Sequence, residues 1–132
     1  MTTVYLNGEY IPKSEAKISI EDRGFMLADG IYEVTPYYES VPFYGDRHLQ
    51  RMRNGLGWMR IPFDAGVFEE VGRELIARNG LEKAPTAIVY MQVTRGVAPR
   101  THYFPKEPIT PTVYAHAKAW DRPAPERWAT GF

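Results

Sequence analysis

Apolar and polar residues repeat with two different periods along this chain, and the first period predicts strands. Two short apolar runs flank Asn7-Gly8, which is the preferred dipeptide for a tight hairpin turn. Residues 31–38 then alternate as in a half-buried strand, and a partner strand is expected over 41–44. Because proline has no amide hydrogen to donate, Pro36 is expected at a sheet edge or a bulge.

The period changes to that of a helix beyond the second hairpin. Apolar residues recur at helical spacing at Leu49, Met52, Leu56 and Met59. Asp46 is the expected N-cap of a helix over 46–58. Two glycines, Gly55 and Gly57, should weaken the second half of this helix by up to about 1 kcal/mol each relative to alanine.

A second helix and two further strands complete the pattern. The helix follows Asp64 and stops at Asn79-Gly80. Its apolar face comprises Val67, Phe68, Val71, Leu75 and Ile76. Strands are expected over 87–94 and 112–118. Two hairpins, two helices and two strands in this order predict an α+β fold with an antiparallel sheet.

Composition narrows the functional classes. The 132 residues carry 16 basic and 16 acidic side chains, so nothing indicates a sequence-independent grip on nucleic acid or on an anionic membrane. The chain has no cysteine, which excludes a thiol nucleophile, and its three histidines are too scattered to predict a metal site. No apolar stretch is long enough to span a bilayer, and the N-terminus lacks a signal pattern. We therefore expect a cytoplasmic domain that binds neither nucleic acid nor membrane.

One loop concentrates cationic chemistry. Arg95, Arg100 and His102 fall on a short segment directly after the strand over 87–94. Guanidinium groups hold carboxylates through paired hydrogen bonds, and an imidazole adds an orientable donor. A rigid strand ending in such a loop suits a small anionic substrate, whereas spacing alone fits a basic surface loop equally well.

A second group of residues favours the substrate-binding interpretation over a basic surface loop. It is Glu21-Asp22-Arg23-Gly24-Phe25-Met26-Leu27-Ala28-Asp29-Gly30-Ile31-Tyr32-Glu33-Val34, followed by Arg47-His48-Leu49-Gln50-Arg51-Met52. Together with the loop after residue 94, it closely resembles the class IV (fold-type IV) pyridoxal-phosphate aminotransferases, and within them the D-amino acid aminotransferases. The resemblance covers the whole chain but only the small N-terminal domain of that family. It implies the α+β fold of that domain and a homodimer with pyridoxal 5'-phosphate as cofactor.

The resemblance also implies a role for individual residues. Arg51 matches the residue that holds the cofactor phosphate. Tyr32 matches the tyrosine whose hydroxyl helps to bind the substrate carboxylate, and Val34 on the same strand face would line the substrate pocket. Arg100 and His102 match the rest of the carboxylate trap and, in the family, reach into the active site of the neighbouring subunit.

Three nearby groups are interpreted as structural rather than catalytic. His48 would support the Arg51 region from one helical turn away, and Arg95 would brace the start of the loop. Glu33 points opposite Tyr32 and is expected to be a buried or paired carboxylate rather than a general base. Many D-amino acid enzymes carry lysine where this chain has Pro36, which leaves the preference for the substrate side chain open.

The main departure from the family is a missing lysine. The family forms its Schiff base with the cofactor through a lysine of the large C-terminal domain, and no lysine here has a matching context. We expect residues 1–119 to form the small domain, and 120–132 to form a connector and the start of the large domain. The Schiff-base lysine is expected beyond Phe132, so this chain alone should be inactive and no catalytic residue is assigned within it.

The predicted function is that of a D-amino acid transaminase, which moves an amino group from a D-amino acid to a 2-oxo acid. Two alternatives stay open. The first keeps the fold and changes the substrate, as in branched-chain aminotransferases or aminodeoxychorismate lyases. The second is a non-catalytic domain that uses the same loop for anion binding or dimerisation.

Overall fold

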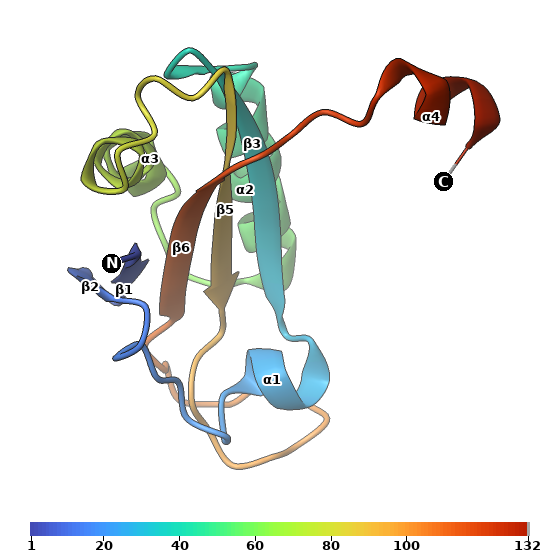
Figure 1. Ribbon diagram of the computed structural model, residues 1–132. Helices are drawn as coiled ribbons and strands as arrows, with labels where there is room; N and C mark the ends of the chain where they lie inside the picture. Colours follow the sequence, from blue (N-terminus) through green and yellow to red (C-terminus); the bar gives the residue numbers. More distant parts are fainter. Residues whose placement is uncertain (132) are drawn as a thin grey trace.

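The sheet forms the centre of the molecule. The computed structural model describes residues 1–131, whose six strands make one antiparallel sheet in the order β2-β1-β6-β5-β3-β4 (Figure 1). The strands are β1 (Thr3–Leu6), β2 (Glu9–Pro12), β3 (Gly30–Tyr38), β4 (Val41–Pro42), β5 (Thr86–Thr94) and β6 (Thr112–Ala119). The helices are α1 (Arg23–Leu27), α2 (Gly45–Met59), α3 (Val67–Arg78) and α4 (Pro125–Thr130). The predicted α+β class with an antiparallel sheet is confirmed.

Both predicted hairpins are present, and the second is shorter than expected. Asn7 and Gly8 join β1 to β2 with positive φ angles of 50° and 99°, as a tight two-residue turn requires. β4 ends at Pro42 instead of extending to residue 44, because Tyr44 adopts a left-handed conformation and the helix begins at Gly45. β4 pairs only with the last two residues of β3, so Pro36 lies where no strand of residues 1–131 pairs with the outer side of β3. The predicted edge position of Pro36 is confirmed.

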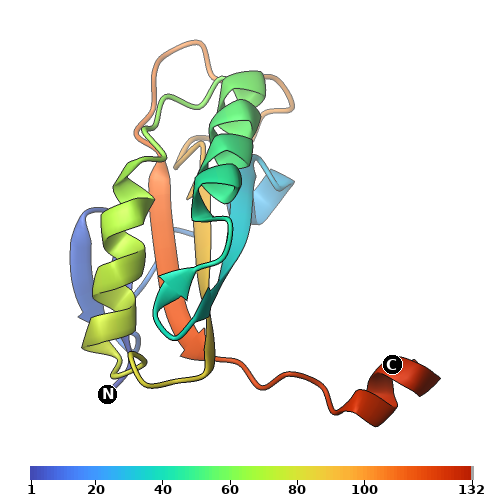
Figure 2. The ribbon, with the colours of Figure 1, turned by 90° about the horizontal axis from the view of Figure 1, so that it is seen from above.

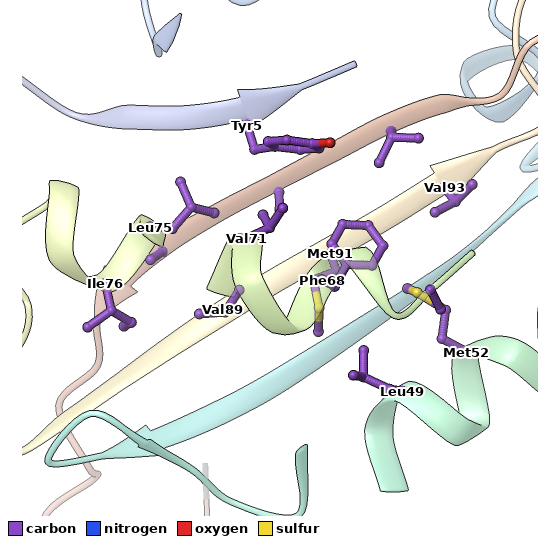
Figure 3. Packing of buried hydrophobic residues seen from close by; sticks show 14 of the residues in the cluster. Tyr5, Leu49, Met52, Phe68, Val71, Leu75, Ile76, Val89, Met91 and Val93 are labelled. Atoms are coloured by element: carbon purple, nitrogen blue, oxygen red, sulfur yellow. The ribbon is translucent and has the colours of Figure 1, made fainter. Parts of the chain in front are cut away.

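α2 and α3 cover one face of the sheet (Figure 2). Side chains from these helices and from the facing side of the strands form one buried cluster (Figure 3). Its members include Tyr5, Met52, Leu56, Phe68, Val71, Leu75, Val89, Met91 and Val93, all at most 8% exposed. Burying one such aliphatic or aromatic side chain stabilises a fold by about 1.5–3 kcal/mol, which accounts for the docking of both helices.

Helix boundaries differ from the predictions in three places. The N-cap of α2 is Tyr44, without a side-chain hydrogen bond, and Asp46 lies in the first turn, so the predicted N-cap at Asp46 is wrong. The carboxylate still suits the positive end of the helix dipole. The short helix α1 was not predicted and is capped by Asp22, whose side chain accepts the Gly24 amide. α4 was not predicted either and buries no residue.

The opposite face of the sheet is covered neither by α2 nor by α3 and is partly apolar, and the short helix α1 packs only at its end, against Thr94. We call this surface the helix-free face and define it by the outward-pointing residues Tyr32, Val34, Tyr90, Gln92, Tyr114 and His116. Register places these residues side by side, because Val34 pairs with Tyr90 and Tyr90 with His116. β3 contributes both to this face and to the free edge beside it.

Candidate functional site

Tyr32 stands on the helix-free face near the start of β3. Its side chain is 64% exposed, and its ring stacks on Tyr90 with centroids 5.7 Å apart and planes inclined by 19°. Tyr90 in turn stacks on His116 at 5.2 Å and donates a hydrogen bond from its hydroxyl to Gln92 Oε1 at 2.5 Å. Burial, then the neighbouring tyrosines Tyr32 and Tyr114, raise the pKa of Tyr90 above its usual range. Tyr32 is therefore an exposed side chain whose ring is held in place by stacking on Tyr90.

Arg51 of α2 is held against β3 by Glu33. The Glu33 side chain is 3% exposed, on the helix side of the strand, and accepts hydrogen bonds from Arg51 Nε and from Arg51 Nη2, the latter at 2.7 Å. His48 Nδ1 lies 2.9 Å from Glu33 Oε2. Glu33 is thus buried and paired, as predicted, and His48 contacts the same carboxylate. That both groups are structural rather than catalytic stays a prediction.

The charge of Glu33 is stabilised by these two partners. Burial alone would raise the pKa of Glu33, but the hydrogen bonds from Arg51 and His48 outweigh it and lower the pKa. The Arg51 side chain remains 72% exposed, and its pKa is raised first by the Glu33 hydrogen bond and then by the Glu33 charge. Within residues 1–131 no hydrogen bond uses Arg51 Nη1. A fixed guanidinium with a free donor edge suits a phosphate or carboxylate.

Arg95 begins the loop after β5 and is buried, as its predicted structural role requires. It donates to both carboxylate oxygens of Asp29, at 2.8 and 2.9 Å, and to the backbone oxygens of Met59 and Arg60 at the end of α2. Asp29 also accepts from Arg23 Nε at 2.7 Å. Burial would raise the pKa of Asp29, yet the two arginines lower it.

Arg100 and His102 are exposed on the same loop. Across residues 1–131, no hydrogen bond, ion pair or ring contact joins either side chain to Tyr32 or Arg51. Within residues 1–131, Arg51 of α2 thus reaches β3 through Glu33 on the helix side, whereas Tyr32 and Val34 lie on the other face of the same strand. Arg100 and His102 lie apart from all three on the loop.

Sequence reasoning missed two features of this region. It named Arg23 and Asp29 as part of a motif without giving either a role, although both are buried and paired with each other. It also missed the support of Tyr32 by Tyr90 and His116, which becomes visible only when β3, β5 and β6 are in register. The Nδ1 atom of His116 is buried without a hydrogen-bond partner among the described residues, and burial, then the neighbouring lysines, lower the pKa of this ring.

The free donor edge of Arg51 suits the phosphate of a phosphorylated cofactor. No cluster of three potential metal ligands occurs within residues 1–131, and none of the helices there has the length and hydrophobicity to span a bilayer. Lys13 and Lys17 line a groove of about 410 Å³ with Leu6, Tyr114 and Gln92 on the helix-free side, but neither has a hydrogen bond or ion pair to Arg51 or Tyr32 within the described part of the chain.

Known proteins share both the sequence and the fold. Residues 30–130 match the amino-transferase class IV family. D-alanine aminotransferases of Staphylococcus haemolyticus and Bacillus licheniformis are 40% and 32% identical to the chain, over 93% and 94% of it and 43% of their own lengths. The chain therefore spans about 43% of the length of these curated relatives.

Solved structures agree on the architecture. The T.th. branched-chain amino acid aminotransferase, solved with pyridoxamine 5'-phosphate, has a TM-score of 0.79 at 24% identity, and the match covers 96% of this chain and 42% of that one. The 4-amino-4-deoxychorismate lyase of Pseudomonas aeruginosa has a TM-score of 0.71 at 28% identity, and the match covers 97% and 44%. Since the family match includes most of the residues, the chain belongs to the class IV aminotransferases.

Proposed function

We propose that the protein containing this chain is a pyridoxal 5'-phosphate-dependent D-amino acid transaminase, which moves an amino group from a D-amino acid to a 2-oxo acid. The relatives called D-alanine aminotransferases support the substrate class. The observation that carries the proposal is the exposed Arg51 guanidinium, fixed by buried Glu33 next to exposed Tyr32. The two side chains would provide one ligand for a phosphate and one for a carboxylate.

Arg51 is the proposed phosphate ligand. Its free Nη1 edge and permanent charge suit a dianion, and the Glu33 contact fixes its direction before the ligand arrives. When bound, pyridoxal 5'-phosphate supplies an electron sink for bond cleavage at the substrate α-carbon. The part played by this chain is to orient that group and the substrate.

Tyr32, Arg100 and His102 are the proposed carboxylate ligands. The exposed hydroxyl of Tyr32 donates to the substrate carboxylate of its own subunit, and Val34 lines the adjacent pocket wall. Arg100 and His102 are exposed and have no ion pair within residues 1–131, which supports the proposal that they serve the neighbouring subunit of a homodimer. Cytoplasmic localisation, like the homodimer, stays a prediction.

The remaining machinery is proposed to lie beyond this chain. Residues 1–119 would form the small domain, and 120–132 the connector to a large domain that carries the cofactor-binding lysine. The lack of buried residues in α4 supports this division, because an uncovered helix needs another packing partner. Phe132 lies outside the described residues. The chain alone is accordingly proposed to be inactive.

The experiment measures transamination by the full-length enzyme. We expect activity with D-alanine and a 2-oxo acid, and Arg51→Met should weaken pyridoxal 5'-phosphate binding at least about tenfold through loss of a charge-assisted contact. Arg53→Met is the matched control, because Arg53 is exposed on the same helix and has no ion pair within residues 1–131. Equal cofactor affinity of the two variants would show that Arg51 does not bind the cofactor phosphate.

A second candidate keeps the fold and changes the substrate. The likeness to a branched-chain aminotransferase and to a 4-amino-4-deoxychorismate lyase supports it at the level of architecture. Parallel assays with D-alanine, L-leucine and 4-amino-4-deoxychorismate separate the three activities. Turnover of either of the last two without turnover of D-alanine would favour this candidate, and phosphate binding with no turnover at all would favour a non-catalytic anion-binding domain.

A further inference from the structure

The loop that carries Arg100 and His102 is tied to the segment that precedes β3. The Arg23 amide donates to the Gly96 oxygen at 2.9 Å, and the Arg95 amide donates to the Asp29 oxygen at 3.0 Å. Asp22 and Val97 form an isolated antiparallel bridge. These backbone contacts hold only the first residues of the loop. They do not hold Arg100 and His102, which lie further along it.

One buried side chain reaches further along the loop. Arg23 is 2% exposed, and its Nε donates to Asp29 at 2.7 Å. Its Nη1 donates to the backbone oxygen of Thr101 at 2.9 Å, with the Thr101 hydroxyl at 3.4 Å. Thr101 is the residue between Arg100 and His102, so the contact falls between the two proposed carboxylate ligands.

Two more contacts brace the same stretch. The Thr101 hydroxyl donates to the Tyr103 oxygen at 3.0 Å, which closes a local turn around His102. The guanidinium of Arg95 lies over the Phe104 ring, 3.9 Å from its centroid. Asp29 accepts hydrogen bonds from both Arg23 and Arg95, so both arginines that contact the loop are held by one buried carboxylate.

The same carboxylate also connects to the helix that carries Arg51. Arg95 donates to the backbone oxygens of Met59 and Arg60, at the C-terminal end of α2. The loop is therefore tied to the end of the helix that carries Arg51 through one network of charge-assisted hydrogen bonds.

We infer that Arg23 is a positioning residue for the substrate carboxylate: held by Asp29, it clamps Thr101 and thereby orders Arg100 and His102. The inference rests on the proposed function and adds a residue that touches neither substrate nor cofactor. A guanidinium is required because its planar fork donates to Asp29 and Thr101 in two directions at once, which the single ammonium of lysine does not reproduce.

The test is Arg23→Lys in the full-length enzyme, which keeps the positive charge beside Asp29 and so limits the risk of misfolding. Amide hydrogen exchange over residues 96–103 should accelerate about tenfold, because loss of the hydrogen bond to the Thr101 oxygen loosens the loop and opens the hydrogen bonds that protect the Gly96 and Ala98 amides. The KM for D-alanine should rise about tenfold, whereas kcat should change less than about threefold and cofactor affinity should not change.

Two further substitutions keep the test independent of the stability of Arg23 variants. Thr101→Val on the loop surface removes the hydroxyl contacts and should shift exchange and KM in the same direction by a smaller factor, whereas Thr101→Ser should preserve both. Arg78→Lys is the control for arginine-to-lysine exchange, since Arg78 lies on α3 and pairs with Glu74.

The outcomes separate the inference from the proposed function. Faster exchange together with a raised KM supports the clamp. Unchanged exchange in Arg23→Lys, or faster exchange with an unchanged KM, overturns it while leaving transamination by the parent enzyme intact. Absence of D-amino acid transamination by the parent enzyme overturns the proposed function and with it the substrate role of Arg23.

Discussion

At the scale of single residues, the support of one aromatic ring by another is open to measurement. Tyr32 is largely exposed, and its stacked neighbour is Tyr90. Tyr90→Leu should therefore let the Tyr32 ring rotate and raise the KM of the full-length enzyme for D-alanine several-fold, in keeping with the about 0.5–1.5 kcal/mol of an aromatic pair. Tyr90→Phe is the matched control, because it keeps the ring and loses only the Gln92 contact. A phenylalanine variant as impaired as the leucine variant would contradict the stacking role.

The alternation along β3 allowed several residue roles to be predicted from the sequence. Period-two spacing placed Tyr32 and Glu33 on opposite faces, and the structure has Tyr32 exposed and Glu33 buried and paired. The roles of Arg23 and Asp29 could not be obtained in this way. Their partners lie across the loop at residues 95 and 101, so their pairing depends on tertiary contacts between segments far apart in sequence.

At the scale of elements, substitutions at the two glycines of α2 distinguish the effect of helix propensity from the effect of packing. A Cβ at Gly57 would meet no atom within 4 Å, whereas a Cβ at Gly55 would lie 3.0–3.3 Å from three atoms of Ile31 on β3. Gly57→Ala should therefore stabilise the protein by about 0.5–1 kcal/mol through helix propensity. Gly55→Ala should not stabilise the protein, because the added methyl group would crowd Ile31 of β3. Urea denaturation of both variants measures the difference, and an equal gain would contradict the close approach of helix and strand.

The packing of the loop that begins at Gly96 can be tested in the same way, by comparing alanine substitutions at Gly96 and at Gly8. Gly96 and Gly8 both have positive φ, 107° and 99°, but a Cβ at Gly96 would lie 2.0 Å from the Thr110 oxygen, while one at Gly8 meets nothing within 4 Å. Gly8→Ala should cost about 1–3 kcal/mol in the free energy of unfolding from backbone strain alone. Gly96→Ala should cost clearly more, because the backbone at residue 110 must also move. Similar denaturation midpoints for the two variants would show that the loop is not packed as described.

Long periodic elements were predictable, and short ones were not. The apolar spacing of α2 and α3 exceeds two turns, so burial of one face leaves a clear pattern, and both helices were predicted to within a few residues. α1 has five residues, too few for a period, and its one local signal is the Asp22 cap. β4 was predicted too long because its apolar run continues into Tyr44, whose left-handed backbone ends the strand.

At the scale of the whole molecule, the two faces of the sheet differ in what they leave uncovered. The helix side buries a continuous cluster, whereas the opposite side presents partly exposed aromatic rings over β3, β5 and β6. Two charged networks hold β3, with Asp29 just before the strand and Glu33 within it. The strand that carries the proposed substrate tyrosine is therefore held by two buried carboxylates.

These carboxylates predict how stability depends on pH. Burial raises the pKa of Asp29 and Glu33, but their arginine and histidine partners outweigh it, so both pKa values are lowered on folding. A group with a depressed folded pKa contributes stability that is fully present above its unfolded pKa of about 4 and is lost as the pH falls toward the folded value. The free energy of unfolding should therefore decline below about pH 4 and be insensitive to these two groups near neutrality.

Urea denaturation at about pH 7 and about pH 3 measures this decline, and Glu33→Gln tests its origin. At neutral pH this variant should be destabilised by about 1–3 kcal/mol, because the amide replaces an ionised acceptor of three partly buried hydrogen bonds. Its further loss of stability on acidification should be smaller than that of the unaltered protein, since one of the depressed carboxyl groups is gone. Glu70→Gln is the control, because its pair with Arg73 is exposed and should contribute little at either pH. An acid dependence that is the same in Glu33→Gln as in the unaltered protein would mean that the Glu33 carboxylate is not held in its charged form by Arg51 and His48.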